Sequence, residues 1–203
     1  MELTGIKNLI FDLGNVLIDI DPKLSTEMFK KLGVHQIDEI YSLKSQNDLF
    51  DNLEMGKISN DDFRNEIRHL SNSNLTDDQI DLAWSAMLLE LPHERLELLA
   101  DLKKRFRIFL LSNTNAIHIK SFNERLNQQN RKDFFYDIFD HVYYSYEIGM
   151  RKPNADIYNH LLDDQSIVAE ECLFIDDLQH NIDGAAQLNF KTQLVEKDIL
   201  DLF

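Results

Sequence analysis

The sequence is poor in cysteine and in long apolar runs. Cys172 is the only cysteine, so no disulfide can form within the chain, and its apolar surroundings predict a small core residue. No apolar run approaches the roughly 20 residues that cross a bilayer, and no basic and apolar signal segment opens the chain. We therefore expect a soluble, cytoplasmic protein with no membrane partner.

Basic residues are also scarce. The 203 residues include 21 Lys and Arg against 36 Asp and Glu, which gives a formal net charge of −15. A surface for nucleic acid or anionic lipid would need clustered Lys and Arg, so we expect neither partner. An anionic substrate must then be held by local positive charge.

The sequence leaves the oligomeric state open between a monomer and a dimer.

Short apolar segments alternate with amphipathic helical patterns. The expected strands are 6–11, 107–111, 141–144, 172–175 and 192–195. The expected helices between them are 93–104, 116–127, 154–162 and 179–188. This alternation is typical of an α/β protein with a doubly wound (Rossmann-like) parallel sheet. The aromatic stretch 134–139 is expected to be a core-packing connector.

Residues 20–90 show helical patterns alone. The first expected helix starts at Asp21 and Pro22, and a second covers roughly 38–55, with a break near 46–47. Three helix starts carry capping signals: Asp21 before Pro22, Ser59 with Asp62, and Thr76 with Gln79. We expect this unit to be an all-helical cap, inserted after the first strand of a core made of residues 1–19 and 91–203.

Polar residues follow the first four expected strands. Asp12 ends the first strand, and Gly14 is expected to let the chain leave it in a conformation that other residues resist. The other polar groups are Ser112 and Asn113 after the second strand, Lys152 beyond the third, and Asp176 and Asp177 after the fourth. In an open parallel sheet these strand ends share the edge where ligands bind.

Each of these residues has a structural alternative. Asp12 can stabilise a turn, Ser112 can cap a helix, and Lys152 can be a solvated residue at a helix start. Asp176 and Asp177 can be helix caps. Their occurrence together at one sheet edge favours a functional site.

The chemistry of these groups is complementary. A carboxylate that attacks a phosphate ester is repelled by roughly 4 kcal/mol for two unit charges about 4 Å apart at an effective dielectric near 20. Asp12 and Asp177 suit Mg²⁺, a hard ion that binds oxygen ligands. Lys152 supplies a fixed positive charge, and the Ser112 hydroxyl can hold phosphoryl oxygens. These groups would therefore complement one another in an attack on a phosphate ester.

The motifs resemble those of the haloacid dehalogenase superfamily. Its four ordered motifs are matched by residues 11–17, 111–115, 149–153 and 175–177, over nearly the whole chain. The helical insertion is similar to that superfamily's four-helix cap. The residues of the motifs most resemble those of a bacterial subgroup of capped phosphatases that includes an α-D-glucose-1-phosphate phosphatase.

This resemblance implies a role for each motif residue. Asp12 is implied as the nucleophile that becomes an aspartyl phosphate. Lys152 is implied as the catalytic residue that neutralises charge on the phosphoryl group and orients Asp12. Ser112 and Asn113 are implied as substrate-binding residues. The implied Mg²⁺ ligands are Asp12, the Gly14 carbonyl, Asp177 and Asp176, with Asp176 either binding the ion or supporting it.

One position departs from the superfamily's pattern. Most of its phosphatases carry a second aspartate two residues after the nucleophile, where this chain has Gly14, and losing a general acid or base typically costs 10²–10⁴-fold. The enzyme either accepts a good leaving group, such as an anomeric sugar oxygen, or borrows an acid. Asp19 and Asp21 are candidates, although each can also be a cap or turn residue.

Three functions remain open. The first is a Mg²⁺-dependent phosphatase of a small phosphorylated metabolite, such as a sugar phosphate. The second is a metal-independent 2-haloacid dehalogenase that uses the same Asp12, and the third is a catalytically weak ligand-binding homologue. The adjacent carboxylates Asp176 and Asp177 favour the first.

The cap is expected to set substrate choice through residues such as Glu54 and Trp84, although Trp84 also fits a core position.

Overall fold

A five-stranded parallel sheet forms the centre of the computed structural model, which describes residues 3–38 and 48–203. Its order is β3-β2-β1-β4-β5, and every neighbouring pair is parallel. The strands are β1 (Asn8–Phe11), β2 (Arg107–Ser112), β3 (His141–Tyr144), β4 (Cys172–Asp176) and β5 (Lys191–Leu194). The doubly wound α/β class predicted from the sequence is confirmed.

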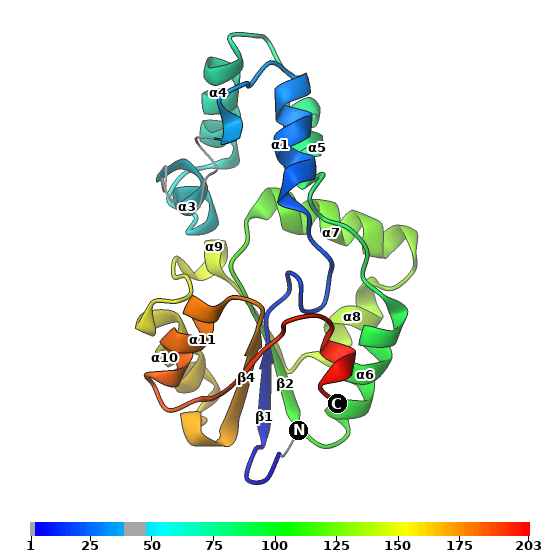
Figure 1. The fold of residues 1–203 in the computed structure, drawn as a ribbon, viewed down its shortest axis with the longest axis vertical. Helices are drawn as coiled ribbons and strands as arrows, with labels where there is room; N and C mark the ends of the chain where they lie inside the picture. The colour runs from blue at the N-terminus through cyan, green and yellow to red at the C-terminus, as the bar shows by residue number, and fades with distance from the viewer. Residues whose placement is uncertain (1–2, 39–47) are drawn as a thin grey trace.

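Both faces of the sheet are buried, which explains the unbroken apolar strands. Along β1, Leu9 and Phe11 belong to one hydrophobic cluster, and Ile10 belongs to the other. The first face is covered by α6 (His93–Lys103), α7 (Ala116–Gln128) and α8 (Lys132–Ile138). The second is covered by α10 (Ala155–Gln165) and α11 (Gln179–Ala186), as Figure 1 shows. Cys172 is a buried member of this second cluster, as predicted.

One local prediction was right about the core but wrong about the connector: the stretch 134–139 packs in the core, and it forms most of helix α8. Phe135 and Ile138 are buried on its inner side, and the Phe135 ring meets that of Phe122 at 5.2 Å, edge to face. Consecutive aromatic residues hide the helical period, because exposed positions such as Phe134 are as apolar as the buried ones.

The helices between β1 and α6 lie together at one end of the molecule (Figure 1). The described ones are α1 (Pro22–Lys31), α3 (Asp48–Glu54), α4 (Asn60–Ser71) and α5 (Asp77–Ser85). The three capping predictions are confirmed, because the side chains of Asp21, Ser59 and Thr76 each accept a hydrogen bond from a first-turn backbone N–H. The expected break near residues 46–47 lies outside the described residues.

Trp84 centres the core of this helical group. Its side chain is 2% exposed, and its ring lies 4.9 Å from that of Phe50 and 5.7 Å from that of Phe63, centroid to centroid. On its other side the Trp84 ring stacks at 4.6 Å on His118 of α7. Trp84 is therefore a packing residue that joins the helical group to the sheet's own helices.

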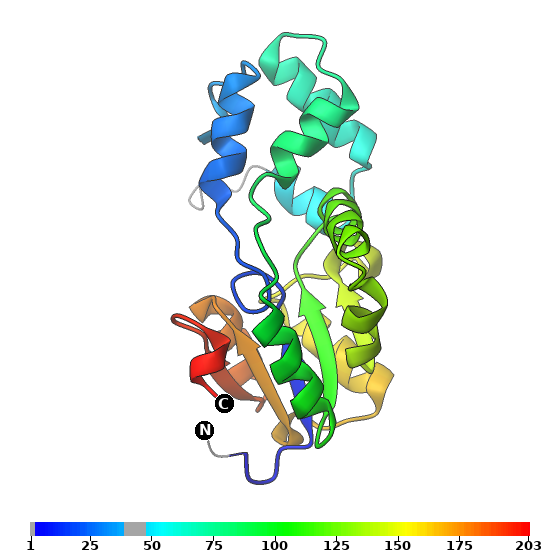
Figure 2. The same cartoon turned by 90° about the vertical axis from the view of Figure 1, so that its right-hand side faces the viewer.

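Two paired segments connect the helical group to the sheet, and Figure 2 shows them side by side. Asp19 and Asp21 exchange backbone hydrogen bonds of 2.9–3.0 Å with the segment Met87–Glu90. The buried Arg95 guanidinium of α6 donates to Leu17 O at 3.1 Å and to Asp19 Oδ1 at 2.8 Å. Arg125 of α7 donates to main-chain oxygens of the returning segment. The buried Arg95 and the partly buried Arg125 thus hold the connection against the core.

Among the described residues, none of the helices combines the length and apolar character that crossing a bilayer requires.

Candidate active site

Asp12 lies at the carboxyl edge of the sheet, directly after the central strand β1. Its backbone N–H donates to Ile175 O of β4 at 2.9 Å, so the main chain is still held by the sheet. The side chain is only 8% exposed. This placement fixes one carboxylate at the edge where ligands bind in open parallel sheets.

The Lys152 ammonium bridges two carboxylates. Its Nζ lies 2.7 Å from Asp12 Oδ1 and 2.6 Å from Asp176 Oδ2. Lys152 is 1% exposed although it lies in a loop, and its Nζ is 5.4 Å from the centre of the Phe174 ring. The alternative of a solvated lysine at a helix start is therefore wrong. The buried ammonium ties β1 and β4 together at the site.

Asp176 is fully buried, and hydrogen bonds surround it. Oδ1 accepts from the backbone N–H of Leu178 at 2.9 Å and from Asn181 Nδ2 at 3.0 Å, while Oδ2 accepts from Lys152. Both oxygens therefore have partners that hold the carboxylate in place. This arrangement favours a supporting role for Asp176 over direct binding of an ion.

Asp177 turns toward the loop that follows β1. Its Oδ2 accepts from Asn15 Nδ2 at 3.1 Å. One oxygen from each of Asp12, Asp176 and Asp177 lies within 4.8 Å of the others. Such a group of carboxylate oxygens suits a hard divalent cation such as Mg²⁺.

The charges of the site are unbalanced. Burial raises the pKa of Asp12 to about 7 against the lowering effect of Lys152, and the nearby Asp176 and Asp177 raise it further. Burial also raises the pKa of Asp177. Burial alone lowers the pKa of the Lys152 ammonium, but the charges of Asp12 and Asp176 outweigh it and raise that pKa above its usual value. Within the described part of the chain, the Lys152 ammonium thus faces three carboxylates, and an added cation relieves the excess negative charge.

Ser112 is the last residue of β2, and Asn113 follows it. Ser112 is 2% exposed, and the cap of α7 is Asn115, whose side chain accepts from His118 N, so the capping alternative for Ser112 is wrong. Asn113 contacts the lysine loop: its Nδ2 donates to Lys152 O and its Oδ1 accepts from Lys152 N, both at 2.9 Å. The structure therefore gives Asn113 a contact that positions Lys152.

The reason for a glycine at position 14 differs from the one expected. The φ angle of Gly14 lies outside the left-handed region, and the residue there is Asn15, with φ 51°. A Cβ at Gly14 would instead lie 2.5 Å from Cδ1 of Ile20. Gly14 therefore leaves room for the end of the Ile20 side chain, which a larger residue would have to displace.

Both residues considered as replacement acids have structural partners. Asp21 caps α1, with Oδ1 accepting from Lys23 N at 3.0 Å. Asp19 pairs with Arg95 in the connecting segment. The structure thus supports the cap interpretation for Asp21, whereas Asp19 forms an ion pair, which the sequence did not predict.

Sequence reasoning missed the two asparagines that hold the acidic residues. Asn15 also accepts from Ile20 N at 3.0 Å, so it joins the β1 loop to Asp177. Asn181 lies one turn into α11, five residues after the Asp176 that it contacts. Its spacing from the paired aspartates was the available signal.

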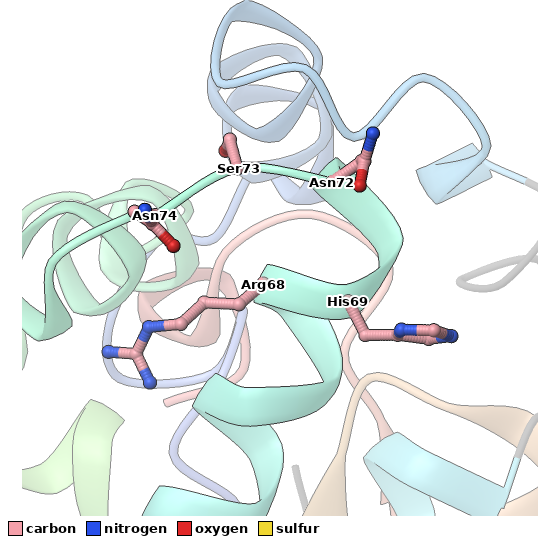
Figure 3. A pocket seen from close by; sticks show the side chains of 5 residues that line it. All are labelled: Arg68, His69, Asn72, Ser73 and Asn74. Carbon is pink, nitrogen blue, oxygen red and sulfur yellow. The ribbon is translucent and has the colours of Figure 1, made fainter.

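An open hollow occurs at the tip of the helical group, at the end of α4 and far from these carboxylates (Figures 1 and 3). Figure 3 shows Arg68 and His69 there pointing in different directions. Arg68 donates to Leu75 O at 2.7 Å and also pairs with Asp77. Its charge is therefore used within the helical group.

Comparisons with known proteins show the family of this chain. Residues 6–189 match the model of the haloacid dehalogenase-like hydrolase family. The chain is 32% identical over 188 residues to a D-ribitol-5-phosphate phosphatase of Bacteroides thetaiotaomicron, covering 92% of this chain and 90% of that protein.

Solved structures give the same result. A haloacid dehalogenase (HAD) family enzyme of B. thetaiotaomicron, crystallised as the wild-type protein with magnesium and inorganic phosphate, is 36% identical, with a TM-score of 0.86 over 98% of this chain and 99% of that one. A HAD-like hydrolase of Porphyromonas gingivalis is 35% identical, with a TM-score of 0.85 over 94% and 91% of the two chains. The family resemblance seen in the four motifs is confirmed, and the chain belongs to the haloacid dehalogenase-like hydrolase family.

Proposed function

We propose that the protein is a Mg²⁺-dependent phosphomonoesterase of a small phosphorylated metabolite. The observation that carries this proposal is the Lys152 ammonium between Asp12 and Asp176, with Asp177 beside them. A nucleophilic carboxylate can approach an anion only where positive charge offsets the repulsion. The relative named D-ribitol-5-phosphate phosphatase favours a sugar or polyol phosphate as the substrate.

In the proposed reaction an Asp12 oxygen attacks phosphorus, the ester P–O bond breaks, and an aspartyl phosphate forms. The departing alcohol oxygen takes a proton from water, and a second water then attacks phosphorus, so that the bond between Asp12 and the phosphoryl group breaks and inorganic phosphate leaves. The proton lost by the second water neutralises the hydroxide left in the first step. Lys152 holds Asp12 in place and offsets charge on the phosphoryl group. Ser112 binds phosphoryl oxygens, and Asn113 positions Lys152 in preference to contacting substrate itself.

Magnesium, when bound, supplies positive charge that offsets the phosphate dianion. The oxygens that would hold it are those of Asp12 and Asp177 and the Gly14 carbonyl, with Asp176 supporting them because its own oxygens are already partnered. The donor set is entirely oxygen, which fits this ion.

We also propose that residues 1–19 and 91–203 form the catalytic core and residues 20–90 a cap. The backbone pairing of Asp19 and Asp21 with the segment Met87–Glu90 supports boundaries at these positions. In this arrangement the cap emerges from the loop after β1, at the same edge as Asp12.

The 2-haloacid dehalogenase remains the main competing function. It needs Asp12 but gains nothing from a further carboxylate at Asp177, because its substrate is a monoanion. A catalytically weak binding protein is the other alternative.

One assay separates the three functions. Phosphate release with and without Mg²⁺ is measured from D-ribitol 5-phosphate, glucose 1-phosphate and an aryl phosphate, and halide release from a 2-haloacid, with Asp12→Asn as the control. We expect Mg²⁺-dependent phosphate release that Asp12→Asn abolishes. Halide release without metal would establish the dehalogenase, and turnover of neither substrate class would leave the binding protein.

A further inference from the structure

Arg151, the residue before Lys152, contacts the cap. Its Nη1 lies 2.6 Å from Asp51 Oδ1, and its Nη2 lies 3.1 Å from Glu54 Oε2. Both carboxylates belong to helix α3, and all three side chains are 21–26% exposed. This partly buried ion-pair cluster joins the cap to a loop of the core.

The backbone of the cap also approaches the core closely near this ion-pair cluster. Gly56, just after α3, has φ +62°, and a Cβ there would lie 2.3 Å from the carbonyl oxygen of Tyr146. Tyr146 belongs to the short helix α9 (Ser145–Ile148), which precedes the Arg151 loop and contacts α3, as Figure 1 shows. The end of α3 therefore sits directly on the segment that leads to the catalytic lysine.

Consecutive side chains at this loop serve opposite partners. Arg151 binds the cap carboxylates, whereas Lys152 binds Asp12 and Asp176. Asn113 holds the main chain between them through both its donor and its acceptor. A movement of α3 away from the core would therefore act on the residue next to Lys152.

We propose that Arg151 is a positioning residue that holds the cap against the core and so keeps the loop that carries Lys152 in place. This proposal rests on the proposed phosphatase function only for its kinetic readout. Asp51 and Glu54 are two carboxylates that share one guanidinium. Burial raises the pKa of Glu54, Arg151 lowers it, and Asp51 raises it, which indicates that these acids repel each other when the guanidinium is removed.

The test uses charge removal on each side of the contact. Arg151→Gln leaves two uncompensated carboxylates, whereas the triple variant Arg151→Gln with Asp51→Asn and Glu54→Gln removes the repulsion as well. Arg64→Gln is the matched control, because Arg64 pairs with Asp81 at 2.7 Å within the cap and does not reach the core. Arg151→Lys tests rescue by charge alone.

Two readouts are measured: kcat and KM for phosphate release, and the radius of gyration in solution by X-ray scattering. We expect Arg151→Gln to lower kcat/KM roughly tenfold and to increase the radius of gyration, with the triple variant and Arg151→Lys recovering part of both. Arg64→Gln should change neither, although it lowers the melting temperature.

Scattering reports the cap's position without any turnover, so it tests the contact even if the chain proves not to be a phosphatase. An Arg151→Gln variant with the wild-type radius of gyration and the wild-type kinetic constants would overturn the proposal. An effect in Arg64→Gln equal to that in Arg151→Gln would overturn it as well, because the loss would then be general.

Discussion

The Asn113 carboxamide is hydrogen-bonded at both ends to the main chain of Lys152, with its Nδ2 donating to the carbonyl oxygen and its Oδ1 accepting from the N–H, each at 2.9 Å. This reciprocal pair joins the end of β2 to the lysine loop across 39 residues of sequence. Because it fixes the backbone of Lys152, it also fixes where the ammonium sits between the two aspartates.

Replacing Asn113 with alanine should therefore misplace Lys152 without removing it. A displacement of about 1 Å at a reacting group can cost 10²-fold in rate, so we expect kcat to fall about 100-fold while KM changes less. Steady-state kinetics with Mg²⁺ measures this. Lys120→Ala, an exposed change on α7, is the control. An Asn113→Ala enzyme with unchanged kcat and a raised KM would instead indicate substrate binding, the role first predicted for this residue.

Lys152→Met should destabilise the fold as well as abolish turnover. The substitution keeps an apolar stem but leaves Asp12 and Asp176 buried without their cation, and breaking a buried ion pair by removing one partner costs about 3–5 kcal/mol. Urea unfolding in the presence of a chelator measures the loss. The double variant Lys152→Met with Asp176→Asn should recover part of it, since one of the two uncompensated charges is gone. No recovery would contradict this electrostatic account.

Most of the candidate site residues that the sequence predicted lie at or just beyond the ends of strands. Asp12, Lys152 and Asp177 were found because parallel strands bring their carboxyl ends to one edge. The partner of Asp19 was not found, because Arg95 lies 76 residues away and the pairing depends on how α6 packs. The close contact of Gly14 with Ile20 could not be predicted either, because it exists only after the loop has folded back.

The buried His118 should make stability depend on pH. Burial lowers its pKa to about 4, while the pKa of an unfolded histidine is about 6.5, so the unfolded chain binds the proton more tightly. The contribution of His118 is therefore complete above about pH 6.5 and is lost as the pH falls toward 4, by at most about 3 kcal/mol.

Other groups titrate in the same range, so His118 must be isolated by difference. His118→Phe keeps a ring against Trp84 but cannot take up a proton. The free energy of unfolding of both proteins is measured in urea from pH 7.5 to 4.5. We expect the wild type to lose more stability than the variant over this interval. Parallel curves would show that His118 is not the group responsible.

Magnesium should stabilise the protein even without substrate. A ligand at 100 times its Kd stabilises the native state by about 2.7 kcal/mol. The proposed ligands Asp12 and Asp177 come together only when the chain is folded, so we expect the ion to bind the native state alone. Melting temperature is recorded against MgCl₂ concentration. Asp177→Asn should abolish most of the shift, whereas Asp163→Asn, the same charge change on the exposed side of α10, should keep it. Equal shifts in both variants would place the ion elsewhere.

Gly14 and Ile20 should show a coupled response to substitution. In Gly14→Ala the new Cβ meets Ile20 Cδ1 at 2.5 Å, and because this half-buried side-chain end can move, we expect a cost at the low end of the roughly 1–3 kcal/mol typical of overpacking. Ile20→Val removes that methyl group, so the double variant should be more stable than the sum of the two single effects predicts. A double-mutant cycle from urea unfolding gives the interaction energy, which we expect to be about 1 kcal/mol. Strict additivity would mean that the glycine is required for backbone conformation after all, since a backbone cost does not depend on the Ile20 side chain.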